Sequence, residues 1–159
     1  MRGVLERLID DSWREIGCNS KKVIDLAKPQ YTFQTKPLLI GGKAMEFYGL
    51  RPAGDDIDFV VMRTDHAGLT TLYPEHTKDL SGDLGICVDE FELWTSICLF
   101  DYGFLSINAI ETEHYLVISL EKLLFLKALA IQEPKYERDL RLIVKKILDI
   151  QYNKDTSNP

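Results

Sequence analysis

Two aspartates separated by one residue, Asp56 and Asp58, are the residues whose type and spacing most clearly suggest chemistry. They open the run D-I-D-F-V-V-M over residues 56–62, a pattern typical of a strand with a polar start and an apolar end. Residues two apart in a strand face the same side of the sheet. Both carboxylates are therefore expected to project together.

Adjacent carboxylates repel each other, and burying them without a partner is costly. No basic residue adjoins Asp56 or Asp58 in the sequence, so a divalent cation is the natural partner if the pair is buried. Ligands that are all oxygen favour Mg²⁺ or Mn²⁺ over zinc. Taken alone, the pair is also consistent with a strand end in solvent.

A glycine pair, Gly41 and Gly42, ends the apolar run at residues 38–40, which predicts a short buried strand before a tight turn. A short helix is expected over residues 43–50. Glycine lets the backbone approach a ligand closely, and free N–H groups at the start of a helix favour an anion such as phosphate. Thirteen residues separate this turn from Asp56. The two features together predict a site for a metal and a nucleoside triphosphate (NTP).

The stretch L-L-I-G-G-K-A-M-E-F-Y-G-L-R-P-A-G-D-D-I-D-F-V-V over residues 38–61 resembles the signature of the polymerase-beta-like nucleotidyltransferase superfamily. That signature is a hydrophobic residue, Gly, then Gly or Ser, a spacer, and Asp-hydrophobic-Asp-hydrophobic. The variant found here is especially similar to the small bacterial toxin–antitoxin nucleotidyltransferases of the AbiEii-like and minimal kinds. The resemblance spans roughly residues 38–148, and its first motif is the most specific part.

The resemblance implies Mg²⁺- or Mn²⁺-dependent transfer of a nucleoside monophosphate from an NTP to an acceptor hydroxyl. Asp56 and Asp58 would bind the metal with a third carboxylate on a later strand. The best match for that third carboxylate is Asp89, in the strand expected over residues 85–91, and Glu92 is a weaker alternative. Asp89 is also the expected base.

The resemblance further assigns the phosphate-binding and charge-offsetting groups. Gly41 and Gly42 would hold the β- and γ-phosphates, with Lys43 just past the turn. In these families an Arg often precedes the acidic pair, and Arg51 stands in that place, although it can equally pair with Asp55. In the helix after the sheet, Lys127 would offset the charge that develops during transfer. Asp139 falls near an Arg-Asp element usual in these families, but the surrounding sequence departs from the pattern, and its role stays open.

The order of the expected helices and strands that position these residues predicts an α+β fold. It has a small mixed sheet flanked by helices, in one domain over residues 1–159. Ser119 is expected to cap a helix that runs to about residue 132. A helical lead is expected over residues 1–30, a loop over 64–83 and a frayed tail from about 152. The remaining expected elements are strands at 104–110 and 115–118, a short helix at 21–27, and a last helix with an apolar stripe of Leu140, Ile143, Val144, Ile147 and Leu148.

Composition bounds the partners and the location. The formal net charge is −6, which disfavours general nucleic-acid binding because phosphate contacts require Lys and Arg. The three cysteines form no CxxC pair and no apolar run approaches the roughly 20 residues of a membrane helix, so a cytoplasmic location is expected. The acceptor is expected to be a tRNA end or a protein side chain. The alternative is a non-catalytic partner-binding protein that retains the fold.

Overall fold

The computed structural model describes residues 23–155. The described part is α+β, as predicted, and its long α5–α6 segment follows the strands in the chain. The strands are β1 (Leu38–Leu39), β2 (Ile57–Val60), β3 (Thr77–Leu80), β4 (Asp83–Val88), β5 (Phe91–Trp94), β6 (Ser96–Ile97), β7 (Phe100–Asp101), β8 (Ile110–Glu111) and β9 (Leu116–Val117). The helices are α2 (Gly41–Phe47), α3 (Arg63–Leu72), η1 (Pro74–His76), α4 (Tyr102–Leu105), α5 (Leu120–Leu129) and α6 (Pro134–Asp155).

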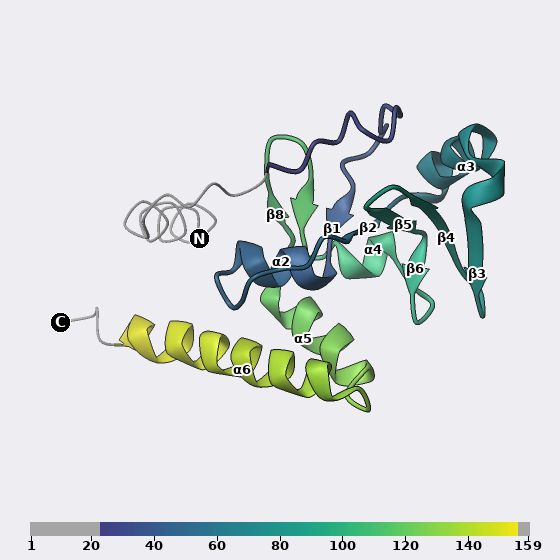
Figure 1. The fold of residues 1–159 in the computed structure, drawn as a ribbon. Helices are drawn as coiled ribbons and strands as arrows, with labels where there is room; N and C mark the ends of the chain where they lie inside the picture. Colours follow the sequence, from purple (N-terminus) through teal and green to yellow (C-terminus); the bar gives the residue numbers. More distant parts are fainter. Residues whose placement is uncertain (1–22, 156–159) are drawn as a thin grey trace.

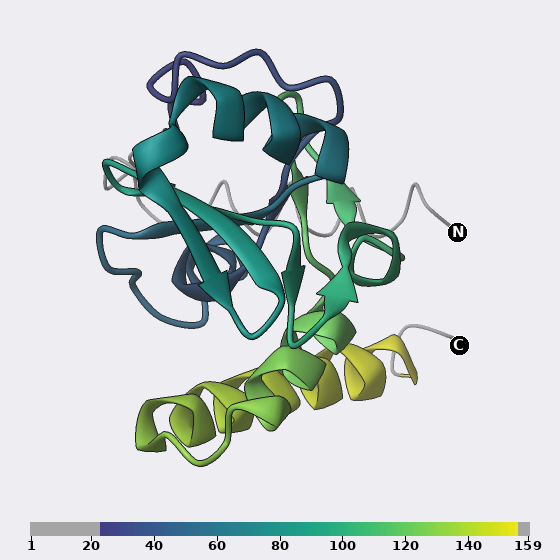
Figure 2. The same cartoon turned by 90° about the vertical axis from the view of Figure 1, so that its right-hand side faces the viewer.

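The described strands form a mixed seven-stranded sheet in the order β3-β4-β5-β2-β1-β9-β8 and a separate β6–β7 ribbon. The β2–β5 and β1–β9 pairs are parallel, and the other pairs are antiparallel. Figure 2 shows α3 on one side of the sheet and the α5–α6 pair on the other. In Figure 1, α5 and α6 run in opposite directions beneath the sheet, and α2 lies between them and the strands.

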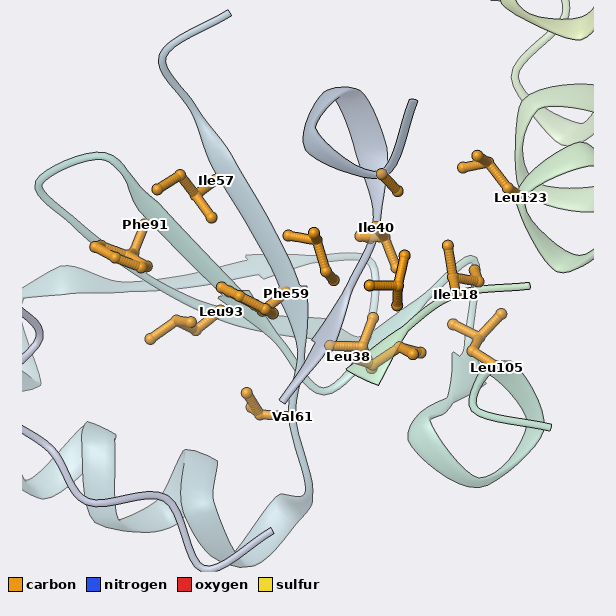
Figure 3. Close-up of a cluster of buried hydrophobic side chains, with 14 of the residues drawn as sticks. Leu38, Ile40, Ile57, Phe59, Val61, Phe91, Leu93, Leu105, Ile118 and Leu123 are labelled. Carbon is orange, nitrogen blue, oxygen red and sulfur yellow. The ribbon is translucent and has the colours of Figure 1, made fainter. Parts of the chain in front are cut away.

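The core gathers on the central strands, and in β2 and β5 three of the four residues are buried. Phe59 of β2 and Phe91 of β5 are buried and stack with their ring centroids 6.5 Å apart (Figure 3). Truncating either ring to alanine is expected to cost about 3–5 kcal/mol. Asp58 and Glu92, the half-buried residues of these strands, lie on the opposite face.

Two sequence predictions about the middle of the chain are wrong. Residues 64–83 are not a loop, because they contain α3, η1 and β3. The sequence does not show what holds α3 in place. The side chain of Asp65 is completely buried and accepts hydrogen bonds from the backbone N–H groups of Gln34 and Thr35. The strand predicted at 104–110 is also wrong, because Asp101 accepts from the Phe104 N–H at 3.0 Å and starts α4 there.

Some predicted ends of helices agree with the structure and others do not. Ser119 caps α5 as predicted, accepting from the Lys122 N–H at 3.2 Å. The expected helical lead falls largely on residues outside the described range, and residues 26–29 form a turn where a short helix was predicted. At the other end, α6 is described through Asp155, and the rest of the tail expected to fray lies outside the described residues. No helix within residues 23–155 combines the length and apolar character needed to cross a membrane.

Candidate functional site

The close approach of Gly41 to Asp58 is the centre of the candidate site. Gly41 has φ +64°, and a Cβ built on it would lie 2.4 Å from Oδ2 of Asp58. The neighbouring Ile40 N–H donates to the backbone oxygen of Asp58 at 3.0 Å. Only glycine satisfies both the left-handed backbone and the contact without strain. The predicted proximity of the glycine turn and the acidic pair is thus present in the structure.

The start of α2 lies at this contact. The helix begins at Gly41, and its N-cap residue, Ile40, provides no side-chain cap. The first N–H groups of a helix have no partner inside the helix, so they are left for solvent or for a ligand. A Cβ on Gly42 would be in ordinary contact, 3.8 Å from Nη1 of Arg51. Lys43 lies beside Glu46, with Nζ 3.8 Å from Oε2.

Three carboxylates influence one another on this face of the sheet. The parallel register pairs Asp58 with Glu92, while Asp56 lies just before β2 and is exposed. Burial, followed by the charges of Glu92 and Asp56, raises the pKa of Asp58 to about 6, although Lys127 and Lys135 oppose the rise. The side chain at the centre of the site is therefore an acid whose ionisation is held back by its surroundings.

The structure corrects the predicted position of Asp89. Residues 85–91 are not one strand: β4 ends at Val88, and Asp89 lies in the tight turn before β5 with φ +50°. Its side chain is exposed, and it is not among the charges that shift the pKa of Asp58. The neighbouring Glu90 forms an ion pair with Lys28. Glu92, the weaker alternative in the sequence, is the carboxylate that the register brings beside Asp58.

A buried ion-pair network connects Lys127, Asp139 and Arg51. The carboxylate of Asp139 is 2% exposed; it accepts from Lys127 Nζ at 2.8 Å and from Arg51 through Nε at 2.5 Å and Nη2 at 2.8 Å. Burial alone would raise the pKa of Asp139, but the hydrogen bonds and charges of both cations outweigh it and lower that pKa. Asp139 is therefore an anion shared by the two predicted cations, and Asp55 is not the partner of Arg51.

Tyr136 lies at the edge of this network, near the start of α6. Its ring centroid is 4.6 Å from Nζ of Lys127 and 4.7 Å from Nζ of Lys135. The Tyr136 side chain also contributes to a raised pKa of Arg51, for which the hydrogen bond to Asp139 is the largest cause. Neither Lys135 nor Tyr136 is among the site residues predicted from the sequence, because both look like ordinary residues of an amphipathic helix.

The carboxylates of Asp56, Asp58 and Glu92, which we call the acidic face, have the oxygen donors that fit a hard divalent cation. A positive ion there would relieve the repulsion that raises the pKa of Asp58. Within residues 23–155, no group of three or more His, Cys, Asp and Glu side chains is arranged to hold an ion unaided. Mg²⁺ commonly takes one or two carboxylates and completes its shell with water and substrate phosphates. Asp56 and Asp58 are the two carboxylates that could hold an ion in that way.

Comparisons of the chain with protein-family models, with curated proteins and with solved structures find no match. A functional assignment must therefore come from the geometry and chemistry of the site, since a fold class alone does not define an activity. The site consists of a glycine turn in close contact with Asp58, the carboxylate of Glu92 beside it, and the lysines of α5 and α6.

Proposed function

We propose that the protein transfers a nucleoside monophosphate from an NTP to an acceptor hydroxyl, with pyrophosphate as the leaving group. The observation that carries the proposal is the contact between Gly41 and Asp58, because it joins a glycine turn suited to phosphate with an acidic pair suited to a cation. The motif in the sequence that resembles nucleotidyltransferases supports the same interpretation.

The reaction requires that one bond to the α-phosphorus forms while another breaks. The acceptor hydroxyl loses its proton, its oxygen bonds to the α-phosphorus, and the bond from that phosphorus to the bridging oxygen of pyrophosphate breaks. Bound Mg²⁺ supplies charge stabilisation for the entering and leaving oxygens. Asp56 and Asp58 would hold the ion, and we assign the acceptor's proton to Glu92, the third carboxylate of this face.

Lys127 of α5 and Arg51 of the loop between α2 and β2 would stabilise the negative charge of the triphosphate. Lys127 and Arg51 share one carboxylate, so the network of three residues retains one net positive charge beside the acidic face. Asp139 fixes both cations in place, which avoids the cost of ordering them when the substrate binds. We therefore treat Asp139 as a positioning residue and Lys127 as the group nearer the reacting phosphates.

The acceptor remains a choice between a tRNA end and a protein hydroxyl. Incubating the protein with each α-labelled NTP and Mg²⁺, with either total tRNA or a tRNA-free lysate, tests both. We expect label to enter one of the two fractions and to require Asp58, so Asp58→Asn is the matched control. Label that enters neither fraction with any NTP would contradict the proposal.

A second candidate function is that of a non-catalytic partner-binding protein. It is favoured by an apolar groove along α6, where Val144 and Leu148 are 39% and 45% exposed although the sequence predicts them on the packed stripe. The groove is lined by Ile131, Glu137, Leu140, Arg141, Val144, Lys145 and Leu148. Under this alternative, the protein would show no Mg²⁺-dependent binding of an NTP.

A further inference from the structure

Lys127 is not available as a freely moving phosphate ligand. Its side chain is 7% exposed, its ammonium forms an ion pair with Asp139 at 2.8 Å, and the ring of Tyr136 covers another side of it. Arg51 commits Nε and Nη2 to the same carboxylate. Taking either cation away from Asp139 would leave a buried charge with one partner fewer, which is costly.

Lys135 has a different environment on the same side of the molecule. It lies in the first turn of α6 and is exposed, and its Nζ is 4.7 Å from the ring centroid of Tyr136, on which Lys127 also packs. The shared ring links Lys135 to Lys127 and, through the carboxylate that Lys127 and Arg51 share, to the glycine turn beside Arg51. Among residues 23–155, no carboxylate lies within ion-pair distance of the Lys135 ammonium.

We propose that Lys135 is the residue that binds the triphosphate of the nucleotide, with Tyr136 holding its side chain toward the site. This inference rests on the proposed function and adds a substrate-binding residue that its motif does not contain. The long flexible stem of lysine lets its ammonium leave the tyrosine ring and follow the phosphates. The nucleotide then binds next to an immobile ion-pair network, formed by Lys127, Arg51 and Asp139.

The chemistry specifies which part of the ligand Lys135 recognises. A lysine ammonium is a compact point charge without base selectivity, so its contribution should depend on the number of phosphates and not on the nucleobase. The loss caused by removing Lys135 is therefore expected to be larger for ATP than for AMP. It should also be similar for ATP and CTP, and it should shrink as salt screens the charge.

The test is calorimetric binding of ATP and AMP with Mg²⁺ to the full chain and to Lys135→Ala, Lys135→Arg and Lys146→Ala. Lys146 is a matched control because it is also a lysine of α6, lies outside the groove along that helix, and is eleven residues away, about 16 Å along the helix. We expect Lys135→Ala to weaken ATP binding about tenfold and AMP binding much less. Lys135→Arg should retain most of the affinity, and Lys146→Ala should equal the wild type.

The outcomes separate this inference from the function on which it rests. If the wild type binds Mg²⁺–ATP and Lys135→Ala binds it within twofold, Lys135 is not the triphosphate ligand and the proposed function stands. If the wild type binds no nucleotide with Mg²⁺, the proposed function fails and the inference fails with it. An equal loss for ATP and AMP would also overturn the inference. Lys135 is exposed, so the melting temperature of each variant should confirm that folding is unchanged.

Discussion

Replacing Asp58 with asparagine is expected to stabilise the metal-free protein while it abolishes transfer. In the folded protein, burial and the charges of Glu92 and Asp56 raise the pKa of Asp58 from 3.8 to about 6. The folded state therefore holds this proton more tightly than the unfolded state. The stabilising contribution is complete below the unfolded pKa and is lost as the pH rises through about 6.

The magnitude follows from that difference. About two pKa units at roughly 1.4 kcal/mol each give an upper limit of about 3 kcal/mol at pH 7. Because asparagine still has to bury a polar amide, we expect about 2 kcal/mol, or a rise in melting temperature of about 4–8 °C. The gain should shrink as the pH is lowered from 7 to 4, where the wild-type Asp58 is itself protonated.

The assay is urea unfolding at pH 4.5, 6 and 7.5 in EDTA, so that no bound metal stabilises the wild type. Asp56→Asn is the control, because Asp56 carries the same charge in an exposed position and should change stability much less. If Asp58→Asn were less stable than the wild type at pH 7.5, or its effect did not vary with pH, the electrostatic account of the site would be refuted.

Three further tests, two of them with a control variant, probe the geometry. Gly41→Ala should cost about 2 kcal/mol or more in unfolding free energy, because it places a Cβ in a left-handed position against a carboxylate, whereas Gly42→Ala should fold normally; equal melting temperatures would contradict this. Asp139→Ala should cost about 3 kcal/mol by leaving two cations without their shared anion, and a neutral effect in urea unfolding would show that the network is not structural. Glu92→Gln should reduce transfer at least about a hundredfold, the lower end of the usual range for general bases, while Asp89→Asn leaves it unchanged; the opposite ranking would restore the assignment from the sequence.

The parts of the site that the sequence predicts are those encoded locally. A glycine pair after an apolar run and a D-x-D pattern at a strand start indicate a turn and a strand that begins with acidic residues, all within 18 residues. The structure adds that the two features touch, through Gly41 and Asp58. The cap at Ser119 was predictable for the same reason, since one hydroxyl and the following N–H groups decide it.

The parts that the sequence does not predict depend on contacts between distant residues. Asp89 and Glu92 lie in one apolar run, and only the hairpin turn at positive φ decides which of them reaches the acidic face. The network of Asp139 joins Arg51 across 88 residues, so no local pattern shows it. The helix α3 is stabilised by the burial of Asp65 against a segment about 30 residues earlier, although its own sequence is rich in polar and β-branched residues.

The most direct test of the central claim is to compare NTP labelled at the α-phosphorus with NTP labelled at the γ-phosphorus, using the wild type with Mg²⁺ and the acceptor fraction that becomes labelled. The account predicts that α-label enters the acceptor, that γ-label appears only in released pyrophosphate, and that EDTA or Asp58→Asn stops both. Transfer of γ-label to the acceptor would show a phosphotransferase instead. Equal α-label transfer by Asp58→Asn would contradict the account, because the reaction would then not take place at this site.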